Sequence, residues 1–140
     1  MPQQNFELKV YTGAITVPVV DEIDGEKIGS FKFNPSDLDI VKRYKEVAEN
    51  FNSISVSEDP SETEVLEVSE KLKEQIDYLL NYNVSGELFA KCNPLTPTSS
   101  GDFFIENIMS GIAEIIEMAT NQRIAKKKAK IRKATAKYHK

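Results

Sequence analysis

The sequence predicts an α+β fold: a small N-terminal antiparallel sheet or hairpin packed on three main helices, with the C-terminal helix long and projecting. Three observations support this fold class. Apolar and polar residues alternate in the first third of the chain, as they do in strands, and apolar residues then recur at helical spacing. No glycine or proline follows Gly111, so nothing in the sequence breaks the last helix before the C-terminus.

The first third of the chain contains two alternating apolar runs and a hairpin signal. The runs are formed by Phe6, Leu8 and Val10, and then by Ile15, Val17 and Val19. The pair Asp24-Gly25 is typical of a tight hairpin turn, so the returning strand is expected at about 27–33, with both of its phenylalanines on one face. Pro18 cannot donate a ladder hydrogen bond, which places the second run at a sheet edge or at an irregularity.

The first predicted helix follows the segment NPSDLD at 34–39. Ser36 can cap this helix with its side chain, and the acidic residues after it suit the positive end of the helix dipole. Apolar residues then recur on one side of the helix as far as Phe51, and a loop is expected at 52–59.

A second helix start lies in the segment DPSE. Asp59 is the expected cap, and Pro60 the first helical residue, a position where proline loses no hydrogen bond. The apolar face of this helix runs from Val65 to Leu80, and its outer face is mostly acidic. The pattern indicates an amphipathic helix that packs by one face.

The remaining chain predicts a short helical segment, a loop and the long last helix. The segment ELFAK at 87–91 is expected to form one or two turns, and 92–101, with two prolines and no ionised group, is expected to be a loop. The last helix is expected to open near Asp102 and to run for about 35 residues, an unusual length for a small domain. Beyond Thr120 its apolar residues thin out to Ile124, Ile131 and Tyr138, which are seven residues apart.

The residues that carry chemistry in enzymes and metalloproteins are scarce. One cysteine and one histidine cannot form a zinc site. Gly25 and Gly29 are interpreted as turn residues rather than as a phosphate-binding loop. The many carboxylates lie in helical patterns and are interpreted as a solvated face. The sequence therefore predicts no enzyme, no metal and no cofactor.

The sequence also bears on the compartment. Cys92 is the single cysteine, and its inability to form an internal disulfide agrees with a reducing environment. The start MPQQNFELKV lacks the basic and apolar pattern of a secretory signal, and no run of apolar residues is long enough to cross a membrane. We therefore expect a cytoplasmic protein.

Charge is strongly segregated along the chain. Nine of the 18 Lys and Arg lie in 123–140, which holds no acid, while all 22 Asp and Glu lie in 1–122. The formal charge of 1–122 is thus about −13 and that of 123–140 is +9. We interpret 1–122 as a single α+β domain and 123–140, the basic extension, as a helical continuation. An acidic body repels phosphate backbones, so a nucleic-acid role would depend on the basic extension alone.

Three interpretations of the basic extension remain open at this point. It can be a solvated helix end, because alanine and lysine are strong helix formers and cations favour a helix C-terminus. It can contact a protein partner, or it can bind nucleic acid. Against nucleic acid, it holds one aromatic residue, Tyr138, and no base-reading motif.

The order of the segments resembles a group of small proteins of phages and prophages of Gram-positive bacteria, the tail assembly chaperones. The similar segments are FKFNPSDLDIVKRYKE, the acidic helix EVLEVSEKLKEQIDYLL, the link VSGELFAKCNPLTPTSSGDFFIENIMSGI and the Lys-rich C-terminal helix. In the link, the small folded turn before the last helix would be carried by Gly86, Leu88, Phe89 and Cys92. The resemblance implies a non-enzymatic cytoplasmic assembly factor that engages the tape-measure protein, or tail-tube subunits, before the tail assembles. It implies no catalytic residues.

The spacing and charge of the basic extension suggest how it would bind such a partner. Ile124, Ile131 and Tyr138 would form a contact seam on one helix face, and the cations around them would steer the partner. The cations in this hypothesis are Arg123, Lys127, Lys128 and Arg132. The same stripe can also pair with itself in a homo-oligomer. The rival functions are a nucleic-acid-associated phage protein and a structural minor tail protein.

Overall fold

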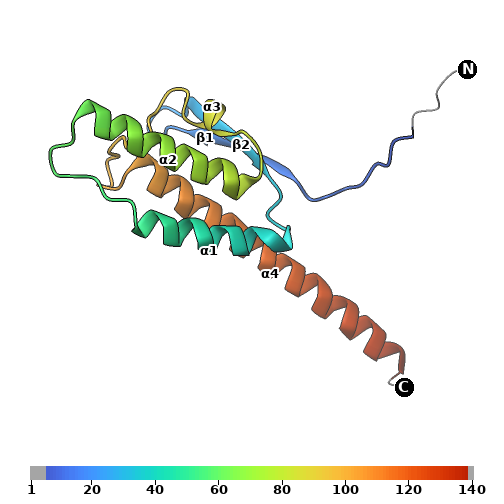
Figure 1. The fold of residues 1–140 in the computed structure, drawn as a ribbon. Helices are drawn as coiled ribbons and strands as arrows, with labels where there is room; N and C mark the ends of the chain where they lie inside the picture. Colours follow the sequence, from blue (N-terminus) through green and yellow to red (C-terminus); the bar gives the residue numbers. More distant parts are fainter. Residues whose placement is uncertain (1–5, 139–140) are drawn as a thin grey trace, which may run out of the picture.

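The computed structural model describes the backbone of residues 6–138 and the side chains of residues 6–122. The elements follow in the order β1 (Ile15–Val20), β2 (Lys27–Phe33), α1 (Leu38–Asn52), α2 (Glu62–Leu80), α3 (Ser85–Leu88) and α4 (Phe104–Tyr138). The predicted α+β fold is confirmed: β1 and β2 form an antiparallel hairpin, the helices pack on it, and α4 extends past them (Figure 1).

The hairpin forms where the sequence predicts it. Its loop is closed by two hydrogen bonds of 2.8 Å, one from the Asp21 N–H to the Glu26 carbonyl and one from the Gly25 N–H to the Asp21 carbonyl. Gly25 adopts φ +69°, a left-handed conformation that favours glycine. The register shifts between Val19 and Val20, close to Pro18 on a strand with no second partner in the described chain, as expected for an edge or an irregularity.

The first alternating run is not a strand, and this prediction was wrong. Residues 6–14, the N-terminal arm, lead away from the body without a strand partner (Figure 1). Gly13 turns the chain at φ +85°, and the Asn34 side-chain amide donates to the Thr12 carbonyl at 2.6 Å. These contacts direct the arm past the end of β2 rather than back along β1. The backbone of β2 also bonds outside the hairpin, since its Lys32 N–H donates to the Tyr82 hydroxyl.

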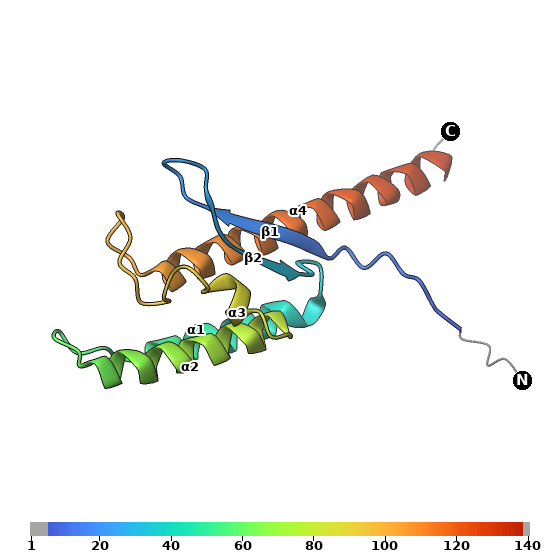
Figure 2. The same ribbon diagram turned by 90° about the horizontal axis from the view of Figure 1, so that it is seen from above.

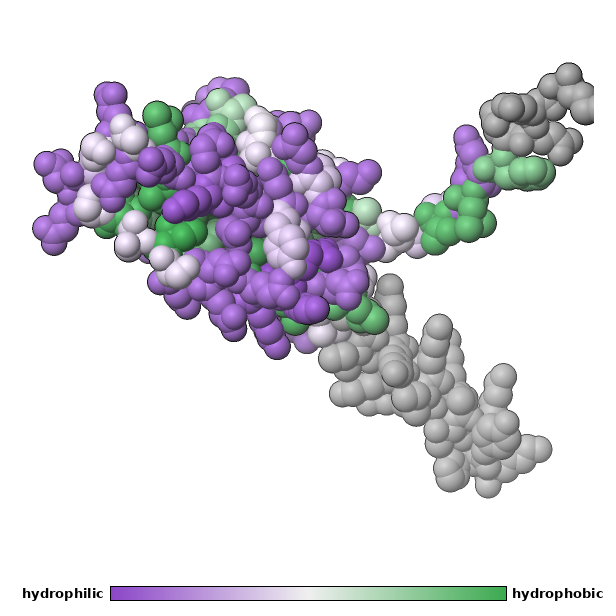
Figure 3. Space-filling view, in the orientation of Figure 1, coloured by the Kyte–Doolittle hydropathy of each residue, from purple (hydrophilic) through white to green (hydrophobic). Residues whose placement is uncertain are grey.

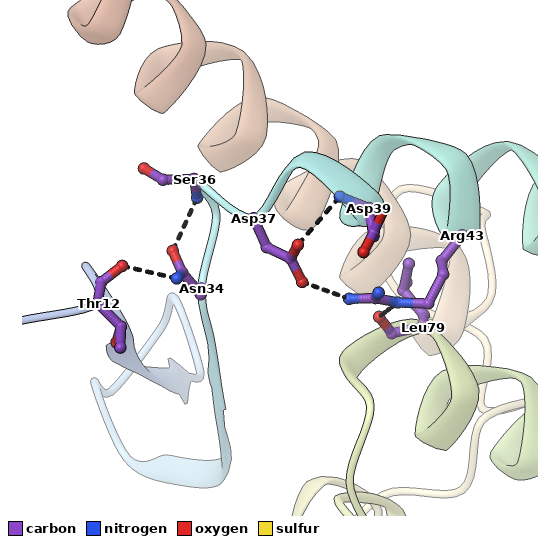
Figure 4. Close-up of polar contacts among 7 residues, drawn as sticks. All are labelled: Thr12, Asn34, Ser36, Asp37, Asp39, Arg43 and Leu79. Carbon is purple, nitrogen blue, oxygen red and sulfur yellow. Dashed lines mark hydrogen bonds and ion pairs between the residues drawn. The ribbon is translucent and has the colours of Figure 1, made fainter. Parts of the chain in front are cut away.

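The cap of α1 is Asp37 rather than the predicted Ser36. The Asp37 carboxylate accepts the Asp39 N–H at 3.0 Å and the Arg43 guanidinium at 3.1 Å (Figure 4). Arg43 also donates from Nε to the Leu79 carbonyl at 3.0 Å, so it satisfies the C-terminal end of α2. The backbone N–H of Ser36 instead belongs to the turn before the helix, where it donates to Asn34 Oδ1 at 2.9 Å.

The cap of α2 also lies later than predicted. Ser61, not Asp59, accepts the Glu64 N–H at 3.2 Å, and Pro60 precedes the helix instead of opening it. The Glu64 carboxylate accepts both the N–H and the hydroxyl of Ser57, at 3.1 and 2.6 Å. This pair of bonds fastens the loop between α1 and α2 to the first turn of α2, which explains why the helix begins two residues further on.

The helical segment after α2, in contrast, starts earlier than predicted. The helix α3 covers Ser85–Leu88 rather than 87–91, because the Asp77 carboxylate accepts the N–H groups of Val84 and Ser85 and the Ser85 hydroxyl at 2.8–3.0 Å. The last helix, α4, opens at Phe104, close to the predicted Asp102, and its 35 residues confirm the predicted length.

The core lies between the hairpin, α1–α3 and the first half of α4. Its buried side chains are Phe31, Phe33, Ile40, Val47, Val68, Leu72, Ile76, Leu79, Leu80, Val84, Leu88, Phe89, Phe104, Ile105, Ile108, Met109, Ile112 and Ile116.

Gly29 is not a turn residue, which corrects the prediction: it lies in β2, where a Cβ would stand 2.7 Å from the Leu88 carbonyl oxygen. Its missing side chain lets α3 approach the strand.

Candidate protein-interaction surfaces

The first candidate surface is the second half of α4. The buried side chains of α4, from Phe104 to Ile116, lie in its first half, where the Tyr44 hydroxyl of α1 donates to the Met109 carbonyl at 3.2 Å and Phe104 contacts Phe89, the residue after α3. Burial of the Tyr44 phenol raises its pKa. By Met118 the side chain is already 61% exposed. Both ribbon views show the helix running on beyond the other elements to its end (Figure 2). The backbone thus presents the basic extension on a helix that has left the body.

The predicted contact residues all lie on this part of α4. They are Arg123, Ile124, Lys127, Lys128, Ile131, Arg132 and Tyr138, and their side chains lie outside the described residues. The backbone is helical from Phe104 through Tyr138, so positions seven apart recur on one face after two turns. The choice of these residues as a binding site stays a prediction.

The second candidate surface is the N-terminal arm, which sequence reasoning interpreted as a strand. Phe6 and Leu8 are 90% and 91% exposed, and Val10 and Tyr11 are also open to solvent. Their apolar side chains stand clear of the body in the space-filling view (Figure 3). Isolated exposed apolar residues are ordinary, but four in one nine-residue extended segment make this segment a candidate for strand-like binding to another chain. The signal for it in the sequence was the alternation of apolar and polar residues.

The third candidate surface is the loop-end groove. The two loops that build it, after α1 and before α4, lie at the end of the body away from both chain termini (Figure 1). The groove consists of two adjoining pockets of about 270 and 510 Å³ between the loop after α1 and the loop before α4. Val56, Leu95 and Phe103 line both pockets and are half-buried. The other apolar lining residues are Phe51, Ile54, Pro60, Val65, Val68, Leu72, Pro97 and Ile105.

Hydrogen bonds hold in place the loop before α4, which lines one side of the loop-end groove. The loop prediction for 92–101 is confirmed, but the loop is well organised: the Thr98 N–H donates to the Asp102 carbonyl at 2.9 Å, and the Phe104 N–H to the Thr96 carbonyl at 2.8 Å. The Ser69 hydroxyl on α2 donates to Asn93 Oδ1 at 3.1 Å. Sequence reasoning missed this groove because two loops about 40 residues apart in the chain build it, and no local pattern reports their proximity.

The charged residues that line the loop-end groove, Glu58 and Glu106, are both acidic, and Lys71 lines the neighbouring pocket that shares Ile54 and Val68 with it. The ranges 52–70 and 92–106, which contain both loops and the first turns of α2 and α4, hold no Lys or Arg. They hold eight acids: Glu58, Asp59, Glu62, Glu64, Glu67, Glu70, Asp102 and Glu106. Hydrogen bonds from Ser57 lower the pKa of Glu64, so this carboxylate stays ionised at neutral pH. The groove therefore suits an apolar ligand with a positive charge.

Within the described residues, the structure gathers no group of three or more metal-ligating side chains. No helix of the described chain combines the length and the apolar character that a membrane crossing requires. Comparison of the chain with protein-family models, with curated proteins and with solved structures gives no match. What the surfaces can do is therefore argued from their own geometry and charge.

Proposed function

We propose that this protein is a non-enzymatic assembly factor that binds a helix-rich protein through the second half of α4. The observation that carries the proposal is the departure of α4 from the body: its side chains are buried up to Ile116, and the helix backbone then continues to Tyr138. Long isolated helices gain little stability from propensity alone, so a partner that covers one face would stabilise this one.

The resemblance to tail assembly chaperones gives this partner an identity. We propose that the partner is the tape-measure protein of a phage or prophage, or a tail-tube subunit, in the bacterial cytoplasm. A tape-measure protein is long and helical, and its apolar stripes need cover before assembly. An amphipathic helix end with cations beside an apolar seam can pair with such stripes by side-by-side helix packing. The acidic body would keep the complex soluble through its net charge.

Co-expression with the tape-measure protein tests the proposal. The full chain is expected to copurify with it, and a chain that ends at Gln122 is not. In the full chain, Ile124→Ser with Ile131→Ser removes two positions of the seam, and Ala125→Ser with Ala129→Ser is the control with the same number of changes on other helix faces. The first variant should lose at least tenfold in affinity and the control less than twofold, since each buried isoleucine contributes about 1–3 kcal/mol. Unchanged binding by the truncated chain would contradict the proposal.

The +9 charge of the basic extension favours nucleic-acid binding as a second candidate function. This candidate predicts retention on DNA or RNA that falls steeply as salt rises and disappears when 123–140 is deleted. It also predicts equal losses for Lys→Ala changes at any position around the helix, because phosphate contacts depend on charge rather than on one face. A seam-dependent loss would favour the protein partner. A third candidate, a structural minor tail protein, predicts that the chain is present in purified phage particles.

A further inference from the structure

We propose that the loop-end groove binds the basic extension of a second copy of this chain, so that copies associate head to tail. In this contact the extension pairs with the groove rather than with a second extension, as in the stripe-to-stripe pairing that the sequence suggests, and the contact does not depend on any tape-measure protein. It joins two surfaces that the chain keeps at opposite ends of the molecule.

The apolar character of the loop-end groove provides the first argument. Val56, Leu95 and Phe103 are only half-buried although they line both pockets, so part of their apolar surface remains in water. Covering that surface with another apolar side chain is favourable because it removes apolar area from water. A helix with apolar residues two turns apart, as at Ile124 and Ile131, delivers two such side chains about 10 Å apart on one face.

Charge complementarity favours the basic extension as the ligand of the groove. The two charged residues that line the groove are acidic, the ranges 52–70 and 92–106 hold six further acids and no Lys or Arg, and the basic extension holds nine Lys and Arg and no acid. Opposite charge brings the two surfaces together and disfavours other apolar ligands, such as the N-terminal arm, where Glu7 and Lys9 cancel each other. Of the segments in this chain, the basic extension is thus the best electrostatic match for the groove.

The geometry of α4 decides that the contact is between copies. Glu106 lines the groove and stands in the first turn of α4, while Ile131 lies 25 residues further along the same unbroken helix. At 1.5 Å per residue, about 38 Å separate the two positions, and a continuous helix cannot fold back. The extension can therefore reach only the groove of another molecule.

A contact between two different surfaces has a structural consequence. Each contact uses one groove and one extension, so two copies joined by one contact keep one free groove and one free extension between them. Association then continues to an open chain or closes into a ring, and two copies that bind each other reciprocally form the smallest closed assembly. A symmetric pairing of two extensions needs no groove, so changes in the groove separate the two modes.

Three full-length variants test the contact. The groove variant carries Val56→Lys and Leu95→Lys, which place cations where the proposal puts a cationic ligand. The extension variant carries Ile124→Glu and Ile131→Glu. The control, Leu66→Lys, makes the same kind of change on α2 at a side chain that is 63% exposed and lines neither pocket. Circular dichroism and the midpoint of urea unfolding check that each variant is folded.

Sedimentation velocity then measures assembly over micromolar concentrations. The wild type and the control are expected to associate, and raising salt from 50 to ~500 mM should weaken this association at least tenfold by screening the charges. Each of the other two variants alone should be monomeric. An equimolar mixture of the two should give a dimer and nothing larger, because one intact groove meets one intact extension.

Four results would overturn the proposal: a monomeric wild type, assembly by the groove variant alone, assembly by the extension variant alone, or no dimer in the mixture. If the groove variant unfolds, Glu58→Lys with Asp59→Lys replaces it, since both side chains are exposed and outside the core. This charge variant must also remain monomeric alone and form a dimer with the extension variant. Failure to bind a tape-measure protein would leave these results unchanged, so the two proposals fail separately.

Discussion

A few polar side chains join elements that are distant in the sequence. Arg43 joins the start of α1 to the last turn of α2 through Asp37 and the Leu79 carbonyl. Asp77 fixes the start of α3 by accepting three hydrogen bonds. Each contact satisfies backbone or charged groups that a helix end otherwise leaves to water. The packing of the small core thus depends on where these helices end as well as on apolar area.

The pair of Asp37 and Arg43 predicts a pH-dependent loss of stability. The pKa of Asp37 is lowered by the Asp39 N–H first and then by Arg43, from an ordinary value of 3.8. Because the folded state then binds fewer protons than the unfolded state, the stabilisation is present above the ordinary pKa and is lost as pH falls through the folded pKa. Asp37→Asn keeps a good cap but removes the charge, so it should cost at most about 1 kcal/mol at pH 7.

Urea unfolding of both proteins at pH 7 and at pH 2–3 measures this effect. The difference between wild type and Asp37→Asn should shrink toward zero in acid. The Asp37 side chain is 36% exposed, so solvent screening keeps the loss small. In an Arg43→Met background the substitution should cost less than in the wild type. An equal cost at both pH values would show that the charge of Asp37 contributes nothing.

The contact between β2 and α3 depends on one absent side chain. A Cβ on Gly29 would meet the backbone carbonyl of Leu88, which cannot rotate away. Gly29→Ala is therefore expected to lower the free energy of unfolding by about 1–3 kcal/mol through overpacking. Gly111→Ala is the matched control: nothing lies within 4 Å of the point where its Cβ would stand, and it sits inside α4, where alanine should add about 0.5–1 kcal/mol. Equal effects of the two changes, measured by urea unfolding, would contradict the close approach.

The sequence predicts best those elements whose signals are local. The hairpin followed from Asp24-Gly25 and its flanking alternation, and the 35-residue α4 from the absence of breakers after Gly111. Where tertiary contacts decide, prediction failed. Ser36 and Asp37 are both good caps, and Arg43, six residues beyond Asp37, selects the second. The alternation in the arm shows strand propensity, which cannot reveal that no partner strand is present in the described chain.

The interaction surfaces show the same division. The basic extension is visible in the sequence because charge and seven-residue spacing are properties of one segment. The loop-end groove is not, because Val56 and Leu95 meet only after α1, α2 and the link have folded. In the sequence, its lining acids Glu58 and Glu106 cannot be distinguished from the other acids of solvated faces, because only the fold brings them to the same groove. Long-range proximity, which a single sequence does not encode in any local pattern, was the missing information.

At the scale of the whole molecule, the body and the basic extension differ in how they are stabilised. Every buried side chain of the described core lies between Phe31 and Ile116. Among residues 6–122, the last buried side chain of α4 is Ile116, and Met118, two residues further on, is 61% exposed. A helix that continues past its core contacts unfolds locally at little free-energy cost. The two parts should therefore respond differently to a protease, because a protease cuts chain that unfolds locally.

Limited trypsin digestion of a dilute sample is expected to cut within 123–140, and after Lys9 in the exposed N-terminal arm, before it cuts within 15–122, which holds eight Lys and Arg. The product should keep the free energy of unfolding of the full chain within about 0.5 kcal/mol, because every described core residue remains in it. Mass spectrometry locates the first cut, and circular dichroism followed during a urea titration gives the free energy of unfolding. A first cut inside α1 or α2 would contradict the division. At higher protein concentration and low salt, head-to-tail contact would cover the extension. Cleavage within 123–140 should then slow several-fold, and Leu95→Lys should remove that protection.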